Sequence, residues 1–248
     1  QTRAPVMLRV NTRRISGPDA IRMLDEDGIQ AERAAIAGTA IRVFHGARRV
    51  AGSRAYREGH VELQDGSSQA AMEALAAVAR NRVLDHCAGG GGKVLALASL
   101  ADAEWFAHDA DAARMSDLPE RARRAGCKVT ILPPGGARAA APYGLVLCDV
   151  PCSGSGTWRR SPDAKWRLTQ ESLNDLCRTQ AEILSDAAPL VAPGGVLAYA
   201  TCSILREENE QQIARFLKAE TGWSRGAEHR WPISGEGDGF YLMQLKRE

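Results

Sequence analysis

The sequence lacks several features that mark membrane, secreted and metal-binding proteins. It has no apolar run long enough to cross a bilayer, and its first residues lack the hydrophobic core of a signal peptide. Its six cysteines form no C-x-x-C pair, and its five histidines do not stand at ligand spacing from them. We therefore expect reduced thiols in a cytoplasmic protein with no membrane contact and no metal site.

Lysine is absent from the first 60 residues, and aromatic residues make up only 5% of the chain. Residues 1–60 hold eleven arginines against six acidic residues, although the net charge of the whole chain is only +2. An arginine-rich segment favours contact with phosphates and stacking on bases. A solvated surface in an arginine-biased proteome explains the charge equally well. The aromatic residues of this segment are only Phe44 and Tyr56, so no platform for stacking bases is evident.

The remaining composition, 44% hydrophobic and 25% charged, is that of a globular protein with a sizeable core. From Arg82 onward, apolar strand patterns alternate with helical patterns. This alternation predicts a doubly wound, mostly parallel α/β sheet with helices on both faces. The expected strands are 83–87, 104–108, 127–132, 145–149, 196–200 and 240–245. Helices are expected from the first strand's loop to residue 100 and over 110–125, 171–191 and 206–220, with loops at 133–144 and 221–239.

The first part of the chain reads as a small α+β module. Strands are expected at 6–10 and 41–44, and a helix at 18–27 with Pro18 in its first turn. A polar turn at 64–69 caps a strong helix over 70–80. We place a domain boundary at this turn, so that residues 1–67 form the small module and residues 68–248 the larger domain.

A glycine-rich loop follows the first strand of the larger domain. Gly89, Gly90, Gly91 and Gly92 come after Cys87 and Ala88 and before Lys93, where backbone N–H groups at a helix start can approach a ligand. The loop is not a phosphate-binding P-loop, because no Ser or Thr follows the lysine. Asp109 ends the next strand, where a carboxylate can accept hydrogen bonds from ribose hydroxyls. Loop and acid together indicate an adenosine-type cofactor; a tight turn with a surface aspartate is the alternative.

Two later strands end in cysteine motifs. Asp149 is followed by Cys152, and the strand at 196–200 is followed by Cys202. Parallel sheets bind ligands at the carboxyl ends of their strands, so we expect both thiols to face one site, with Cys202 as the nucleophile. Lys93 could lower the pKa of that thiol, and apolar surroundings could make Asp149 a proton donor. Each cysteine taken alone is more often a buried apolar residue.

A cationic segment follows the first cysteine motif. Residues 159–167 combine three arginines and a lysine with Trp166, a combination that could hold a nucleic acid strand. An ordinary surface loop is the alternative interpretation.

Together these stretches resemble the RNA cytosine-5 methyltransferases of the Sun/Fmu/NOL type, especially the bacterial small-subunit rRNA branch. The likeness runs from about Gly59 to the end of the chain, and residues 1–60 match more loosely. The matching segments are Gln64-Asp65 with Ser68-Gln69, Leu84-Asp85-His86-Cys87-Ala88 with Gly91-Gly92-Lys93, Asp149-Val150-Pro151-Cys152-Ser153, Pro162-Asp163 with Lys165-Trp166, Tyr199-Ala200-Thr201-Cys202-Ser203 with Glu207-Glu208-Asn209, and Gly237-Asp238-Gly239-Phe240-Tyr241.

The resemblance implies a Rossmann-like class I methyltransferase that uses S-adenosylmethionine, preceded by an RNA-binding module. It implies that Cys202 attacks carbon 6 of a cytosine, that Asp149 supports protonation of the ring, and that Cys152 assists product release. The implied cofactor residues are Cys87, Ala88, Gly89, Gly90, Gly91, Gly92, Lys93, Asp109 and Asp149, with Lys93 also assigned to catalysis. The implied partner is RNA, with rRNA favoured and the target base single-stranded or flipped out, and we expect a monomer.

Two departures from the family pattern bear on the cofactor. Gly89-Gly90 stands where the family has Ala-Pro, which predicts a more flexible loop. Gly135-Gly136-Ala137-Arg138 lacks the acidic residue that usually follows the third strand, so either the cofactor binds weakly or another residue substitutes. An inactive relative that binds RNA in ribosome assembly is therefore the main alternative, and a small-molecule methyltransferase is a third.

Overall fold

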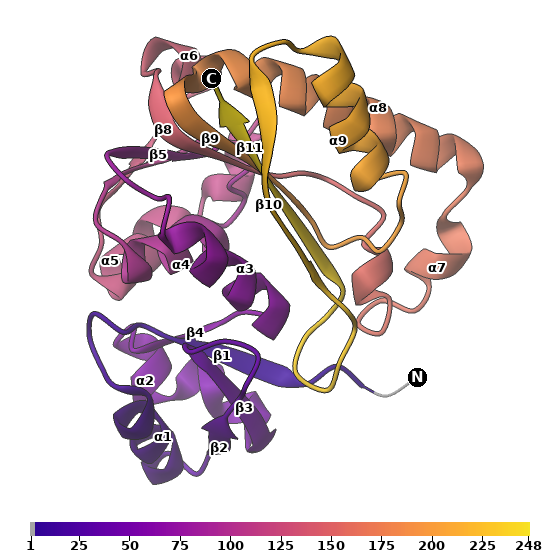
Figure 1. The fold of residues 1–248 in the computed structure, drawn as a ribbon. Helices are drawn as coiled ribbons and strands as arrows, with labels where there is room; N and C mark the ends of the chain where they lie inside the picture. Colours follow the sequence, from indigo (N-terminus) through magenta and orange to yellow (C-terminus); the bar gives the residue numbers. More distant parts are fainter. Residues whose placement is uncertain (1–2) are drawn as a thin grey trace.

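The computed structural model describes residues 3–248, which form a small sheet and a large sheet (Figure 1). The small sheet is antiparallel and has the order β2-β3-β1-β4. Its elements are β1 (Val6–Val10), α1 (Gly17–Glu26), β2 (Gln30–Arg33), β3 (Ala40–His45), α2 (Arg54–Arg57) and β4 (Val61–Leu63). The expected small α+β module is confirmed, although β2, β4 and α2 were not predicted.

Side chains of β1 alternate between its two faces, and this alternation explains how the module packs against the large domain. Leu8 and Val10 point to one face, where they pack with Ala20 and Leu24 of α1. The other face turns towards the large domain, and there Met7 packs with Ala40 of β3 and Ala70 of α3. β1 therefore has one face in its own core and one face against its neighbour.

The large sheet has the order β10-β11-β9-β8-β5-β6-β7, and its five strands from β5 to β9 are parallel. Its strands are β5 (Arg82–Asp85), β6 (Glu104–Ala107), β7 (Val129–Ile131), β8 (Tyr143–Asp149), β9 (Val191–Thr201), β10 (Trp223–Trp231) and β11 (Phe240–Arg247). β11 pairs with β9 and with β10 in antiparallel fashion. The predicted mostly parallel α/β sheet is confirmed.

Helices cover both faces of this sheet, as the alternating pattern predicts (Figure 1). One face packs against α3 (Gly66–Ala76), α4 (Gly92–Leu100) and α5 (Leu118–Ala125). The opposite face packs against α6 (Gly136–Ala139), α8 (Gln170–Ala187) and α9 (Glu210–Ala219). α7 (Ala164–Arg167) lies in the long connection between β8 and α8.

Several predicted boundaries were wrong, and proline accounts for two of them. The helix expected over 110–125 is a 3-10 turn, Ala112–Met115, followed by α5, which starts just before Pro119. The helix expected over 171–191 changes to a 3-10 turn at Pro189, and Val191 already belongs to β9. The helix expected from residue 206 begins at Glu210.

The segments expected to be loops also contain regular structure. α6 lies within 133–144, and β10 occupies much of 221–239. β10 is an edge strand with many exposed polar residues and a bulge between Arg225 and Glu228, so its sequence shows no apolar alternation. Its pairing with β11 decides its conformation.

The small module is fastened to the large domain by polar contacts. The Asn11 amide donates hydrogen bonds to the carbonyls of Gly59 and Ala125, at 3.2 and 2.8 Å. Glu62 of β4 accepts from Arg121 and Arg124 of α5, at 3.4 and 2.7 Å. α3 begins at Gly66, with Asp65 as its cap, so this helix spans the boundary placed after residue 67.

Across residues 3–248, no helix combines the length and the apolar character required of a membrane span.

Candidate active site

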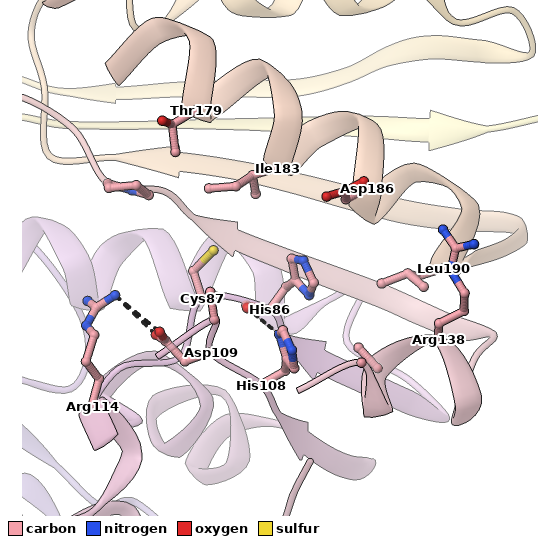
Figure 2. A pocket seen from close by; sticks show the side chains of 14 residues that line it. His86, Cys87, His108, Asp109, Arg114, Arg138, Thr179, Ile183, Asp186 and Leu190 are labelled. Carbon is pink, nitrogen blue, oxygen red and sulfur yellow. Dashed lines mark hydrogen bonds and ion pairs between the residues drawn. The ribbon is translucent and has the colours of Figure 1, made fainter. Parts of the chain in front are cut away.

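Two neighbouring cavities open at the carboxyl ends of the parallel strands. One has a volume of about 450 Å³ and lies between β5, β6 and α8 (Figure 2). The other, of about 440 Å³, lies towards β8, β9 and the small module. Cys87, at the end of β5, lines both cavities. This is the edge at which open α/β sheets bind their ligands.

The structure brings the two strand-end thiols into contact. The Sγ atoms of Cys152 and Cys202 lie 3.4 Å apart, and Cys202 lines the second cavity together with Lys93 and Asp149. The Lys93 Nζ donates a hydrogen bond to Asp149 Oδ2 at 2.5 Å. Asp149 therefore lies against an ammonium group and not in the apolar surroundings considered for a proton donor. The chemical roles of these four residues stay predictions.

Their arrangement distinguishes the two cysteines electrostatically. A hydrogen bond from the Cys152 thiol lowers the pKa of Cys202, and the charge of Lys93 acts in the same direction. The shared hydrogen bond and burial raise the pKa of Cys152 well above its usual range. Burial works against the charge of Lys93, but the adjacent Asp149 raises its pKa, so the ammonium persists. Cys202 is therefore the sulfur better suited to act as a thiolate nucleophile.

A buried carboxylate, Glu208, holds the two cysteine loops together. Its Oε1 accepts hydrogen bonds from the Ser153 N–H at 2.8 Å and from Gln180 Nε2 at 3.0 Å. Its Oε2 accepts from the hydroxyls of Ser153 and Ser203, each at 2.5 Å. Ser153 follows Cys152 and Ser203 follows Cys202, so one side chain fixes the backbone beside both thiols. The matching Glu207-Glu208-Asn209 segment was noticed in the sequence, but this positioning role was not predicted.

Asp85 is a second residue whose place in the site the sequence did not reveal. It is 1% exposed and lines the second cavity. Its Oδ2 accepts the Val94 N–H at the start of α4, whereas Oδ1 has no partner among the described residues. Burial, together with the nearby charge of Asp149, raises the pKa of Asp85 to about 7. Asp85 is thus about half protonated at neutral pH, in a site that already contains the carboxylate of Asp149.

The glycine loop adopts a conformation that requires glycine. Gly89 and Gly91 have positive φ angles of 47° and 78°. A Cβ on Gly91 would meet Leu118 Cδ1 at 2.2 Å. Of the predicted cofactor residues, Cys87 and Asp109 line the first cavity, and Cys87, Ala88, Gly92, Lys93 and Asp149 line the second. Gly89, Gly90 and Gly91 form the loop itself and line neither cavity.

Neighbouring side chains hold this loop through its polar backbone groups. Asp109 Oδ2 accepts the Gly89 N–H at 2.9 Å. Arg121 of α5 donates to the Gly90 carbonyl, and Arg9 of β1 donates to the Gly92 carbonyl at 2.8 Å. The loop that the sequence predicts to be flexible is thus restrained by both the large domain and the small module.

Two histidines lie side by side in the first cavity (Figure 2). His86 and His108 stack with their ring centroids 4.9 Å apart. Burial, and then the neighbouring His108, lowers the pKa of His86 to about 4, so this ring is neutral. Asp186 of α8 also lines this cavity, on the side opposite Asp109. Gly135, in the segment that lacks the expected family acid, lines the same cavity.

The segment 159–167 is only partly available to a ligand. Arg159 and Arg160 both form ion pairs with the buried Asp238, and Arg160 also contacts Asp65 at 2.9 Å. Trp166 on α7, in contrast, is 82% exposed. The two arginines thus join the loop after β8 to the loop before β11, and the tryptophan ring faces solvent.

Comparison with known families decides the identity of the fold. A family model described as 16S rRNA methyltransferase RsmB/F matches residues 72–246, and a model of the RsmF/B-like ferredoxin-like domain matches residues 1–49. The chain belongs to the RsmB/F methyltransferase family. The resemblance to the bacterial small-subunit rRNA branch is therefore confirmed.

Individual relatives agree with this assignment. Ribosomal RNA small subunit methyltransferase B of Salmonella arizonae is 34% identical over 98% of this chain, and that of Escherichia fergusonii 35% identical over 98%. This RsmB/F chain spans about 60% of the length of each of these relatives. A methyltransferase homolog protein from Pyrococcus horikoshii shares the fold, with a TM-score of 0.84 and 24% identity over 100% of this chain and 88% of that one.

The contacts of Glu208 lead to a first prediction. Glu208→Gln keeps the shape of the side chain but replaces an accepting oxygen by an NH₂ group, so both serine hydroxyls cannot be held as before. We expect the rate of Cys202 alkylation by iodoacetamide, measured against pH, to shift towards higher pH as the Cys152–Cys202 contact loosens. Glu207→Gln, at the exposed neighbouring position, is the matched control. An unchanged alkylation profile in Glu208→Gln would contradict the positioning role.

Asp85 leads to a prediction about pH. Its folded-state pKa of about 7 lies above the ordinary value of 3.8, so the folded protein binds this proton more tightly than the unfolded chain. Stability should therefore fall as pH rises from 4 to 7, by up to ~4 kcal/mol from this group. Asp85→Asn should remove that part of the decline, visible in urea unfolding of both proteins across this range. Parallel pH profiles for the two proteins would show the prediction to be wrong.

Arg121 leads to a prediction about the glycine loop. Arg121→Ala removes the hydrogen bond to Gly90 and the ion pair to Glu62, so amide hydrogen exchange over residues 89–92 should accelerate. Arg123→Ala is the control, because that side chain is 76% exposed and pairs with Glu120 on the surface. Equal exchange in the two variants would mean that Arg121 does not restrain the loop.

Proposed function

We propose that this chain transfers a methyl group from S-adenosylmethionine to carbon 5 of a cytosine in RNA, with small-subunit rRNA as the substrate. The observation that carries the proposal is the contact between Cys152 and Cys202 beside the Lys93–Asp149 ion pair. Family membership supports methyl transfer to rRNA in general. The two thiols on neighbouring strand ends are what single out cytosine chemistry, because they supply one group for adduct formation and one for release.

The two adjoining cavities fit the proposed cofactor. The first offers Asp109 and Asp186 as acceptors for hydroxyl or amino groups, and the neutral His86 ring has a buried Nδ1 without a partner in the described chain. The second cavity is lined by Cys87 and also by Cys202. Burial raises the pKa of Cys87, so this sulfur stays a thiol and does not compete as a nucleophile. When bound, S-adenosylmethionine would supply the methyl group that carbon 5 of the cytosine accepts.

Cys202 makes that carbon reactive. Carbon 5 of an aromatic cytosine is a poor nucleophile, and addition of the Cys202 thiolate to carbon 6 disrupts the ring and shifts electron density to carbon 5. A proton delivered to the ring nitrogen keeps the adduct neutral. Asp149, held by Lys93, is positioned at the cavity to orient that edge of the base. Asp85, with its pKa of about 7, is a second group in the cavity that can hold a proton near neutral pH.

Release requires the reverse elimination. Solvent water accepts the proton from carbon 5, the electron pair of that C–H bond forms the 5,6 double bond, and the electron pair of the carbon–sulfur bond leaves on Cys202 as the thiolate, which restores the aromatic ring. Cys152 is placed to assist because its sulfur contacts that of Cys202. Its raised pKa means that it is protonated when Cys202 is the thiolate, so it can stabilise the leaving sulfur by hydrogen bonding.

The small module, residues 1–67 with the boundary placed above, is proposed to bind the RNA. The target base must leave its stack to reach the thiols, at a cost of a few kcal/mol that is lower in a single-stranded loop. Binding of the flanking nucleotides must offset this cost, and the module lies beside the second cavity through Gln64.

Substitution of the two cysteines tests the scheme. Cys202→Ala should abolish transfer of labelled methyl groups from S-adenosylmethionine to unmodified small-subunit rRNA. Cys152→Ala should accumulate a covalent protein–RNA adduct, visible as a slower band in denaturing gels, because release is impaired. Cys177→Ala, which removes a cysteine outside the two cavities, is the control. An active Cys152→Ala enzyme without adduct would refute the two-cysteine scheme, and labelling of metabolites but not RNA would refute the substrate class.

A further inference from the structure

The small module exposes an aromatic residue that its own core does not use. Phe44, at the end of β3, is 61% exposed. The other aromatic residue of the module, Tyr56, packs beneath the guanidinium of Arg124 at 4.3 Å and is not available. Phe44 lines a shallow cavity of about 440 Å³ together with His45, Arg48 and Arg49. The sequence indicated no stacking platform in this module, but the structure exposes the aromatic ring of Phe44 there.

The cations beside Phe44 are free to bind an anion. Arg48 and Arg49 are exposed, and neither forms an ion pair with a carboxylate within residues 3–248. Several other arginines of the module are paired with carboxylates, for example Arg42 with Glu32 and Arg54 with Glu26. Arg48 and Arg49 thus place two unpaired positive charges beside the exposed aromatic ring. An aromatic face beside unpaired arginines matches the bases and phosphates of a single strand.

Shared lining residues connect this surface, cavity by cavity, to the proposed catalytic cavity. The cavity that contains Cys202 is lined at its outer side by Gln64, Asp65 and Arg160. These three residues also line a further cavity of about 280 Å³ that reaches Val6. Val6 in turn lines the cavity that contains Phe44. In Figure 1 the start of β1 extends from the small sheet towards the loop between β10 and β11 of the large domain.

We propose that nucleotides flanking the target base leave the catalytic cavity along this groove, past Arg160 and Val6, and that one base stacks on Phe44. Arg48 and Arg49 neutralise the phosphates on either side of that base. The inference rests on the proposed function, because it assigns the RNA that the catalytic cavity would take. It adds a defined path and a stacking residue to the general role of the module. Single-stranded RNA is the occupant, since a continuous groove from the thiols is what a substrate strand requires.

Stacking and charge give different signatures in RNA binding. Phe44→Ala should weaken binding of an unstructured pyrimidine-rich ribooligonucleotide roughly ten-fold, with the salt dependence unchanged. Phe44→Trp should retain the affinity. Arg48→Ala combined with Arg49→Ala should lower the slope of log affinity against log salt by about 1.4, because each phosphate contact on a single strand contributes about 0.7. Fluorescence anisotropy with the full chain at several salt concentrations measures both effects.

Controls separate this inference from loss of structure and from failure of the proposed activity. Arg215→Ala, on the exposed side of α9, should leave affinity and slope unchanged. Phe44→Ala should raise KM for unmodified small-subunit rRNA while kcat and cofactor affinity stay near wild type. Altered RNA binding by the variants without any methyl transfer would support the groove while refuting the proposed activity. Wild-type affinity and salt slope in all the variants would overturn the groove, and would indicate that Phe44 contacts a protein segment instead.

Discussion

The site depends on one buried carboxylate that is satisfied by hydrogen bonds from both cysteine loops. Glu208 accepts from Ser153, Ser203 and Gln180, and these bonds offset the cost of burying its charge. Two strand ends that are merely adjacent in a sheet do not set the orientation of side chains in the loops that follow. The carboxylate supplies this missing constraint, because it fixes the residue next to each thiol. The unequal pKa values of Cys152 and Cys202 follow from the contact that results.

Charged side chains in the cavity with Cys202 also partly offset one another. Lys93 pairs with Asp149, and burial, together with the nearby charge of Asp149, raises the pKa of Asp85 to about 7. When Cys202 ionises, its thiolate therefore has the ammonium group of Lys93 close by, although the charge of Asp149 acts in the opposite direction. Such an environment favours a thiolate without a metal or a neighbouring histidine.

Much of this arrangement could be predicted from the sequence, for identifiable reasons. Buried parallel strands are marked by apolar runs such as 145–149, and the rule that ligands bind at their carboxyl ends brought Cys152, Cys202 and the glycine loop to one edge. The acceptor roles of Glu208 and Asp85 could not be predicted, because burial depends on contacts between distant segments. β10 was not predicted for the same reason, because a polar edge strand shows no alternation of apolar and polar residues in its sequence. The sequence analysis noted Phe44 but did not predict that its ring is exposed, because exposure depends on which segments pack around it in the folded chain.

The attachment of the small module has a practical consequence for anyone who wishes to shorten this protein. Arg9 reaches from β1 to the Gly92 carbonyl, and Glu62 of β4 anchors Arg121, which in turn holds the Gly90 carbonyl. A truncated chain beginning after the module would lose Arg9 and the anchor of Arg121 at once, although every thiol and carboxylate of the large cavity would remain. The module is in this sense part of the structure that holds the glycine loop, and the smallest chain that keeps this loop restrained is larger than the seven-stranded sheet with its helices.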